Sequence, residues 1–354
     1  MGRKILFTTG SMNQTIQMHQ IARELSEYDC WFSHLFTDSP IINTALKHTS
    51  IIDGSALGNN FKQKSECYLR SHNLQIDYRA EKNDYDLVVF CSDMIIPKRM
   101  MATKTLWIQE GMVDKFNVKS MLVKALGLPR WLSCDTSLNG SSNICDIYCT
   151  ASPGYKNYFA ESGTDNEKIL VTGMPNYDNL EQFVNNDFPY HNYVMVATTD
   201  VRETYRFENR PAFIKRAVKI ANGRPMLFKL HPNEKFERAK REIEKYAPQG
   251  TLVFQAGNTN EMIANCDELI TQYSTVVYTG IALGKKVHSY FDLEQLHKLT
   301  PIQNGGTSSR NIANVCRNFI EFKGPKEDFM QSFKYRPALF KYAEGKRILD
   351  AVSA

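Results

Sequence analysis

Short apolar runs rich in β-branched and aromatic residues alternate with amphipathic stretches of helix length along nearly the whole chain. The first half predicts strands at residues 5–9, 30–36, 87–91, 105–109, 147–150 and 169–172. The second half predicts a fresh series at residues 193–198, 225–230, 251–255, 267–271 and 286–291. Strands separated by helices favour parallel sheets joined by right-handed crossovers. The pattern therefore predicts an α/β protein of two Rossmann-like domains facing across a cleft.

A polar connector at residues 185–189, Asn-Asn-Asp-Phe-Pro, interrupts this alternation. We expect an N-terminal Rossmann-like domain over residues 1–184 and a C-terminal one over residues 190–321. Residues 322–354 are expected to form a helical segment that returns to the first domain, with a helix at about 336–351. The chain of 354 residues is long enough for two domains of ordinary size.

Composition excludes several classes of protein. No apolar run reaches about 18 residues, so no spanning helix is expected, and the N-terminus is interpreted as a first strand rather than a signal peptide. The eight cysteines lack CxxC spacing, which favours buried thiols in a reducing cytoplasm. The histidines lack metal-ligand spacing, so we expect no metal. A net charge of +5 without an arginine-rich tract argues against nucleic acid, but leaves open an anionic substrate or a membrane surface.

The strand-to-helix junction at residues 227–234, Leu-Phe-Lys-Leu-His-Pro-Asn-Glu, delivers His231 to the carboxyl end of a strand. Ligands of open α/β sheets bind outside the carboxyl ends of the strands. His231 could donate a hydrogen bond to a phosphate, or stabilise a leaving phosphate when protonated. A single histidine at a strand end is more often structural. Lys229 either adds charge there or extends its amine to solvent.

Residues 270–275, Ile-Thr-Gln-Tyr-Ser-Thr, repeat this arrangement of a strand, polar side chains and a helix. Gln272, Ser274 and Thr275 are candidate phosphate-binding residues, because free N–H groups at a helix start favour an anion. The alternative is that Ser274 is an ordinary N-cap, worth about 1 kcal/mol. A further pattern, alternating Glu and Lys at 235–245, is typical of an exposed helix face.

In the first half, Gly10 and Ser11 form a strand-to-helix turn that could approach a ligand closely, although no GxGxxG fingerprint is present. Asp93 and Glu110 each follow a predicted strand, so both carboxylates are candidates for a general base. They could equally be polar loop residues. The stretch at 118–135 predicts an apolar helical hairpin, in which 121–132 could be a lid, a membrane-facing patch or a dimer contact.

Four segments, in this order, resemble the GT-B superfamily that contains UDP-N-acetylglucosamine 2-epimerases, CDP-glycerol glycerophosphotransferases and capsule glycosyltransferases. They are the glycine-containing turn and helix start at 10–18, the strand and aspartate at 86–93, the segment at 168–178, and His-Pro-Asn at 231–233. The resemblance implies two Rossmann-like domains, with the nucleotide donor in the second and the acceptor in the first. It implies Asp93 as the counterpart of a catalytic aspartate.

The sequence departs from the epimerase pattern at three places. The epimerases' catalytic histidine falls on Asp200, their Ser-Gly-Gly phosphate loop is replaced at 272–275, and their second acid falls on Gln109, next to Glu110. The segment 271–278 is more similar to the Asp-Tyr-Ser-Ser pattern of the glycerophosphotransferases, although an aspartate of those enzymes falls on Thr279.

Together with these patterns, the resemblance implies a glycosyltransferase that needs no bound metal and moves a sugar or sugar-like group from a nucleotide donor to a glycan or lipid-linked acceptor hydroxyl. The nucleotide sugar would be a substrate, and no separate cofactor is expected. Glu110, ahead of Asp93, would take the acceptor proton, while His231, Ser274 and Thr275 hold the diphosphate. The alternatives are a nucleotide-sugar 2-epimerase and a non-catalytic nucleotide-sugar binder. We expect a cytoplasmic protein, with peripheral membrane association and oligomeric state left open.

Overall fold

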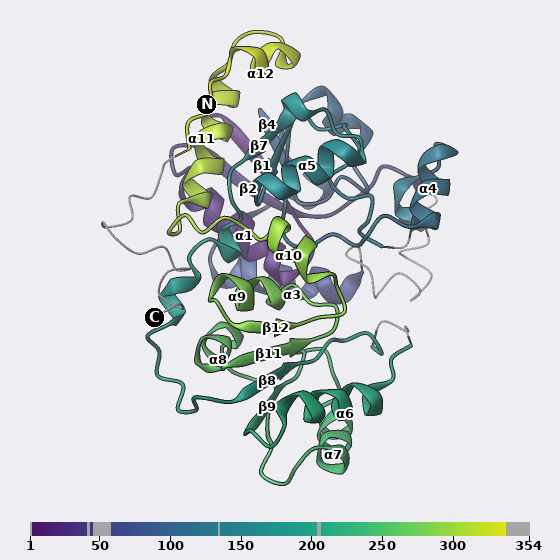
Figure 1. Ribbon diagram of the computed structural model, residues 1–354. Coiled ribbons are helices and arrows are strands. Elements are labelled where there is room, and N and C mark those ends of the chain that lie inside the picture. Colours follow the sequence, from purple (N-terminus) through teal and green to yellow (C-terminus); the bar gives the residue numbers. More distant parts are fainter. Residues whose placement is uncertain (1, 41–42, 45–57, 134, 204–206, 338–354) are drawn as a thin grey trace. The chain divides into compact units, whose positions relative to one another are not determined.

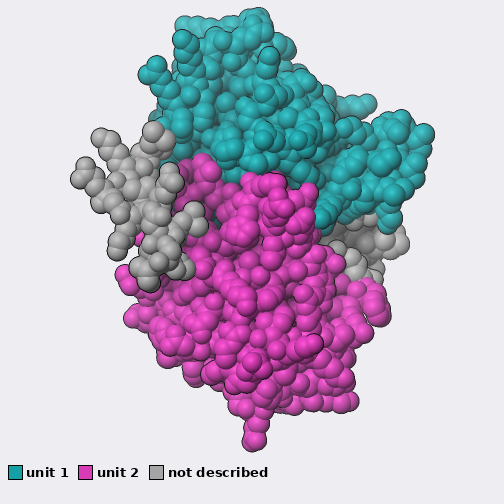
Figure 2. Space-filling view, in the orientation of Figure 1, with its two compact units in different colours: residues 1–178, 306–340 teal, residues 179–305, 341–354 magenta. Residues whose placement is uncertain are grey.

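The computed structural model describes residues 2–40, 43–44, 58–133, 135–203 and 207–337 (Figure 1). The chain divides into two compact units, coloured separately in Figure 2. Unit 1 comprises residues 1–178 and 306–340, and unit 2 comprises 179–305 and 341–354. None of the helices in the described ranges is both long and apolar enough to cross a membrane.

Unit 1 is built on a parallel sheet of seven strands in the order β3-β2-β1-β4-β5-β6-β7. The strands are β1 (Lys4–Thr9), β2 (Asp29–His34), β3 (Gln75–Ile76), β4 (Leu87–Phe90), β5 (Lys104–Ile108), β6 (Ile147–Thr150) and β7 (Ile169–Val171). Its helices are α1 (Met12–Arg23), α3 (Asn59–Ser71), α4 (Val118–Ala125), α5 (Pro153–Ser162), α11 (Ser308–Glu321) and α12 (Phe329–Ser332). Every residue of β4 and β6 is buried, as expected for parallel strands that are covered on both faces.

The two faces of this sheet carry separate packing layers. On one face, apolar residues of α1, α3 and α11 form a single core cluster with alternate strand residues such as Phe7, Val89 and Ile108. On the other, the Trp107 ring packs edge-on against Phe159 of α5, with ring centroids 5.2 Å apart. The β-rich runs are therefore continuous apolar strands rather than alternating ones.

Helix α11 belongs to unit 1, whereas the sequence led us to expect it at the end of the second domain. Its Phe319 is fully buried in the core of unit 1. The Lys104 amine lies 2.7 Å from the carbonyl oxygens of both Phe319 and Phe322, so it satisfies acceptors that a helix end leaves unpaired. The boundaries accordingly lie after Asp178 and before Gly306 rather than at 185–189 and 322. The helix expected at about 336–351 lies almost wholly outside the described residues.

Unit 2 contains a parallel sheet of five strands in the order β10-β9-β8-β11-β12. The strands are β8 (Val194–Ala197), β9 (Met226–Lys229), β10 (Leu252–Phe254), β11 (Glu268–Thr271) and β12 (Lys286–His288). The helices are α6 (Arg210–Ala221), α7 (Phe236–Tyr246), α8 (Thr259–Asn265), α9 (Val276–Ala282) and α10 (Leu293–Leu299). One core cluster joins α6 and α7 to one face of the sheet. On the opposite face, a Cβ atom added at Gly280 of α9 would lie 2.7 Å from Val287 and 2.8 Å from Leu269, so only glycine permits this close approach.

Short 3-10 helices complete the described structure: η2 (Tyr78–Ala80), η3 (Lys98–Ala102), η4 (Arg130–Ser133), η5 (Asn166–Lys168), η6 (Pro175–Tyr177), η7 (Leu180–Phe183) and η8 (Lys326–Asp328). The α/β class with two parallel sheets is confirmed. The seven cysteines among the described residues are free, and burial raises the pKa of the Cys149 thiol to about 12.

The strand order reverses once in each sheet, and this fixes where a ligand is expected. In unit 1 the chain runs outward from β1 and then restarts at β4 on its other side; in unit 2 it restarts at β11 beside β8. In open α/β sheets the crevice outside the carboxyl ends of strands at such a switch point is the preferred ligand site. The turns after β1, β4, β8 and β11 are therefore the places to search.

Candidate functional site

His231 lies two residues beyond the end of β9, on a tight turn that its own backbone stabilises. Its N–H donates to the Glu234 carboxylate at 2.9 Å and to the Thr198 hydroxyl at 3.3 Å. The Asn233 N–H donates to His231 Nδ1 at 3.2 Å. Because Nδ1 accepts this bond, the neutral ring carries its proton on Nε2. The side chain is 37% exposed, so that proton is available to a ligand.

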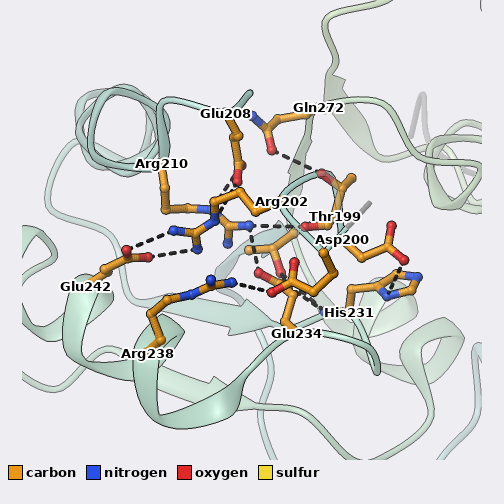
Figure 3. A network of polar contacts seen from close by, with 12 residues as sticks. Thr199, Asp200, Arg202, Glu208, Arg210, His231, Glu234, Arg238, Glu242 and Gln272 are labelled. Atoms are coloured by element: carbon orange, nitrogen blue, oxygen red, sulfur yellow. Dashed lines mark hydrogen bonds and ion pairs between the residues drawn. The ribbon is translucent and has the colours of Figure 1, made fainter. Parts of the chain in front are cut away.

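Asp200, which follows β8, is the carboxylate nearest to this ring (Figure 3). Its Oδ2 lies 3.5 Å from His231 Nδ1 and accepts a 2.9 Å hydrogen bond from the Asn233 side chain. The comparison with the epimerase pattern identified Asp200 only as the position at which the epimerases have their catalytic histidine. Its pairing with His231 depends on β8 and β9 being neighbours in the sheet.

A buried ion pair fixes the turn that carries His231. The Arg210 guanidinium bonds Glu234 Oε1 at 2.6 Å, and both side chains are no more than 1% exposed. The same guanidinium donates to the Thr199 carbonyl at 3.1 Å. Glu208 contacts Arg210 Nε at 2.9 Å. The start of α6, the loop after β8 and the turn after β9 are thus tied together at one point.

The network extends outward onto α7. Arg202 binds Glu242 through two parallel hydrogen bonds of 2.8 and 2.9 Å, and Arg238 pairs with Glu203. Burial acts to raise the pKa of Glu242, but the bonds and charge of Arg202 outweigh it and lower the pKa below its usual value. Part of the charge-rich stretch at 235–245 therefore faces this network rather than solvent. Alternation of charge in sequence carries no signal that separates the two faces.

The carboxyl end of β11 supplies a different set of groups. Gln272 is buried, and its side-chain oxygen accepts a hydrogen bond of 3.3 Å from Thr199. Ser274 and Thr275 come directly before α9, which has only seven residues. The Ser274 hydroxyl accepts a long 3.4 Å bond from the Val276 N–H, while Thr275 makes no side-chain capping bond. Gln272 is thus part of the scaffold, and the two hydroxyl residues form the rim of the switch point.

Lys229 has a structural environment. Its side chain is buried, and its amine donates to the carbonyl of Gln255 at 2.8 Å and that of Leu230 at 3.3 Å. Burial lowers the pKa of Lys229 below that of a free lysine. The amine of Lys229 is therefore hydrogen-bonded to backbone carbonyls that follow β9 and β10.

In unit 1, the turn after β1 is connected to Glu110. Ser11 caps α1 by accepting from the Gln14 N–H at 3.2 Å, and its own N–H donates to the Gln14 side chain at 2.9 Å. The Gln14 amide then donates to Glu110 at 3.3 Å. A Cβ atom at Gly10 would lie 2.3 Å from the Gln14 oxygen, so glycine is required for this arrangement. Burial raises the pKa of Glu110, and the Gln14 bond partly opposes that shift.

Asp93 follows the neighbouring strand β4 but has a fully occupied carboxylate. It is 1% exposed, and its two oxygens accept the N–H groups of Gly140 at 2.7 Å and Ser142 at 2.9 Å. Its own N–H donates to Asn139 at 3.1 Å. These bonds hold the 139–142 loop against the sheet. The structure therefore does not bring Asp93 together with Ser11, Gln14 and Glu110 in one hydrogen-bonded group.

Gln109 is likewise a structural amide. Its side chain accepts from the Ala151 N–H at 2.9 Å and donates to the Gly111 carbonyl at 3.0 Å. Glu110 is then the acidic group available at the end of β5. No group of three His, Cys, Asp or Glu side chains in the described ranges is arranged to hold a metal ion.

The sequence matches no protein-family model and no curated protein. Its fold is similar to solved structures at low identity. The S. aureus MnaA–UDP structure has a TM-score of 0.53 at 10% identity, covering 90% of this chain and 97% of that one. The UDP-GlcNAc 2-epimerase from Neisseria meningitidis bound to UDP-GlcNAc has a TM-score of 0.52 at 12% identity, covering 89% and 99%. A variant of the wall teichoic acid polymerase TagF has a TM-score of 0.51 at 12% identity, covering 90% and 89%. Epimerases and a polymerase share this architecture, and the chain has the GT-B fold.

Proposed function

We propose that this protein is a GT-B glycosyltransferase that moves a sugar or sugar-like group from a nucleotide donor to an acceptor hydroxyl. The observation that carries the proposal is the His231 turn of unit 2. It presents an Nε2–H donor beside the switch point between β8 and β11, with Asp200 next to the ring. Fixed donors of this kind stabilise the negative charge that develops on a departing phosphate.

Three observations support a diphosphate at this edge of unit 2, two from its structure and one from similar proteins. His231 is held at two points by Glu234 and Asn233, so little reorganisation is needed on binding. Ser274 and Thr275 add hydroxyl donors at the end of β11, which is separated from β9 in the sheet by β8. Two of the similar structures contain UDP or UDP-GlcNAc, which are ligands of the proposed chemical class.

Unit 1 supplies the candidate general base. Glu110 is linked through Gln14 to the Gly10–Ser11 turn, and burial raises its pKa toward the range useful for proton transfer. Asp93 is the weaker candidate because backbone N–H groups occupy both of its oxygens. Glu110 would accept the proton of the acceptor hydroxyl as it attacks the donor.

The test is turnover of UDP-, GDP-, CDP- and CMP-linked donors in the presence of mixed glycan acceptors, followed by NMR. A transferase consumes one donor class only when acceptor is present. His231→Ala should then lower turnover about a hundredfold with an unchanged fold. Full turnover in the folded His231→Ala protein would remove this residue from the mechanism.

A nucleotide-sugar 2-epimerase is the second candidate, favoured by the structural likeness to that class. It needs no acceptor. Proton NMR of UDP-N-acetylglucosamine incubated with the protein alone separates the two, since an epimerase changes the sugar signals and a transferase leaves them unchanged. Binding of a nucleotide sugar without turnover under either condition would identify a non-catalytic binder.

A further inference from the structure

Helix α4 presents its apolar stripe outward. Val118, Met121, Leu122 and Leu126 recur at the i, i+3, i+4 and i+8 spacing of one helix face. Their exposed fractions are 71%, 57%, 55% and 67%. A surface helix ordinarily turns such a stripe toward the core, so α4 is inverted. In Figure 1 it lies at the edge of unit 1, where the surface in Figure 2 projects.

The inner face of α4 carries Ser120 and Val123, and polar contacts hold the helix in place. Ser120 is fully buried, and its hydroxyl contacts that of Ser137 at 2.5 Å. Asn117 caps the helix and also donates to Asp135 at 2.7 Å. The Lys124 amine donates to the carbonyl of Ser162 at the end of α5. These contacts hold α4 in the orientation that exposes its apolar stripe.

The apolar surface continues beyond α4 and is basic. Phe116, Leu128, Trp131 and Leu132 are 40%, 42%, 41% and 38% exposed. Half of the sixteen large exposed apolar residues in the described ranges thus fall within residues 116–132. Residues 115–132 contain no Asp or Glu; Lys115, Lys119 and Lys124 are exposed, whereas the Arg130 guanidinium donates to the Leu138 carbonyl and the Ser141 hydroxyl. Two nearby carboxylates, Asp114 and Asp135, are partly exposed and accept hydrogen bonds from Thr136 and Asn117.

We propose that residues 115–132, the α4 platform, dock unit 1 onto an anionic lipid bilayer. Exposed apolar patches mark interaction surfaces. Exposed leucine, methionine and tryptophan side chains on a lysine-bearing segment, without acidic residues, match the interfacial region of an anionic membrane. A protein partner would have to present an apolar surface and negative charge side by side. An anionic bilayer supplies both the apolar layer and the charge. Docking involves neither His231 nor Glu110, so it is independent of the proposed transfer reaction.

The test is co-sedimentation of the full chain with vesicles of phosphatidylcholine alone or mixed with phosphatidylglycerol. Binding should require phosphatidylglycerol and weaken with added salt. Leu122→Ser/Leu126→Ser should reduce partitioning about tenfold or more, and Lys119→Gln about fivefold. Both substitutions lie on exposed positions, so folding should be retained. Val184→Ser, at a 54% exposed site of unit 2, is the matched control and should bind as wild type.

Tryptophan fluorescence gives a second readout. Trp131 is exposed and Trp107 is fully buried, so vesicles should shift the emission of the protein to the blue through Trp131. Trp131→Phe should lose this shift, while Trp31→Phe should keep it. Absence of vesicle binding, or equal binding by the wild type and the double-serine variant, would overturn the proposal. So would a change from oligomer to monomer in that variant without a change in vesicle binding, since the platform would then join copies of the chain.

Discussion

Two acidic residues of unit 1 that occupy similar places have different environments. Asp93 and Glu110 follow the adjacent strands β4 and β5. The Asp93 carboxylate accepts two backbone N–H groups and is buried. Glu110 receives one long bond from Gln14 and remains partly exposed. The first carboxylate holds a loop, and the second is the one that we propose as the general base.

This contrast predicts that two isosteric substitutions change the free energy of unfolding by very different amounts. Asp93→Asn leaves the Gly140 or Ser142 N–H facing an amide donor in a buried site, which should lower the free energy of unfolding by about 2–3 kcal/mol. Glu110→Gln should change it by less than about 0.5 kcal/mol. Urea unfolding curves of both variants make the comparison. Equal stabilities would show that Asp93 does not hold the 139–142 loop.

At this scale, the sequence identifies which polar residues lie at strand ends, because a buried strand followed by a turn is a local pattern. It does not distinguish His231 from Lys229, which were both candidates. Lys229 faces the carbonyls of Leu230 and Gln255, and only the pairing of β9 with β10 brings Gln255 there. Contacts between strands remote in sequence decide which side chain is available.

At the scale of elements, the second unit depends on charged groups packed between helices and strand ends. Arg210 at the start of α6 joins Glu234, just before α7, and the loop after β8. The pair is almost wholly buried, so neither charge has solvent as an alternative partner. Breaking such a pair costs more than the pair contributes, because it leaves one charge buried and unpaired.

Arg210→Met should therefore lower the free energy of unfolding by about 3–5 kcal/mol. It should also loosen the His231 turn, because the Glu234 carboxylate that holds its N–H would lose its partner. Lys219→Met, on the exposed side of the same helix, is the control and should change stability by less than about 0.5 kcal/mol. Denaturant unfolding measures the stability of both variants. If Arg210→Met unfolds at the same denaturant concentration as the wild type, the buried Arg210–Glu234 pair does not stabilise the fold.

Glu268, at the start of β11, predicts a pH dependence of stability. Burial acts to raise its pKa, but contacts with His288, Lys286 and Arg224 outweigh that and hold the pKa at about 2, against 4.5 ordinarily. A carboxylate whose pKa is lowered in the folded state stabilises the protein above pH 4.5. This stabilisation is lost as the pH falls toward 2. The wild type should lose about 3 kcal/mol more than Glu268→Gln over that window. Parallel stability curves for the two proteins would refute this.

Local sequence patterns predicted whether a segment is a strand or a helix. They did not predict which sheet a helix packs against. The expected strands of the second half appear within a few residues of their predicted bounds, although β12 ends at His288 rather than 291. Helix α10 was missed, and α11 was expected in the wrong unit. The apolar face of α11 fits any sheet equally well by its sequence, and its attachment through Lys104 links residues more than 200 positions apart.

At the scale of the whole molecule, each of the two units has its own sheet, its own core and one reversal of strand order. Candidate groups follow strands at or next to that reversal in both units. In unit 1, Gly10 and Ser11 follow β1 and Glu110 follows β5; in unit 2, Asp200, His231 and Ser274 follow β8, β9 and β11. The GT-B fold was evident from short motifs in the right order, even though identity to the similar structures is only 10–12%. Chemistry is not fixed by such a likeness, because epimerases and a polymerase share it.

The measurement that tests the central claim most directly is a thermal-shift panel of the full chain with UDP-, GDP-, CDP- and CMP-linked sugars and the free nucleotides. A ligand at about 100 times its dissociation constant adds roughly 2.7 kcal/mol of stability. We predict a rise confined to one base, diminished in His231→Ala and unchanged in Lys219→Met. No rise with any nucleotide, or an equal rise in His231→Ala, would contradict a donor site at the ends of β8, β9 and β11.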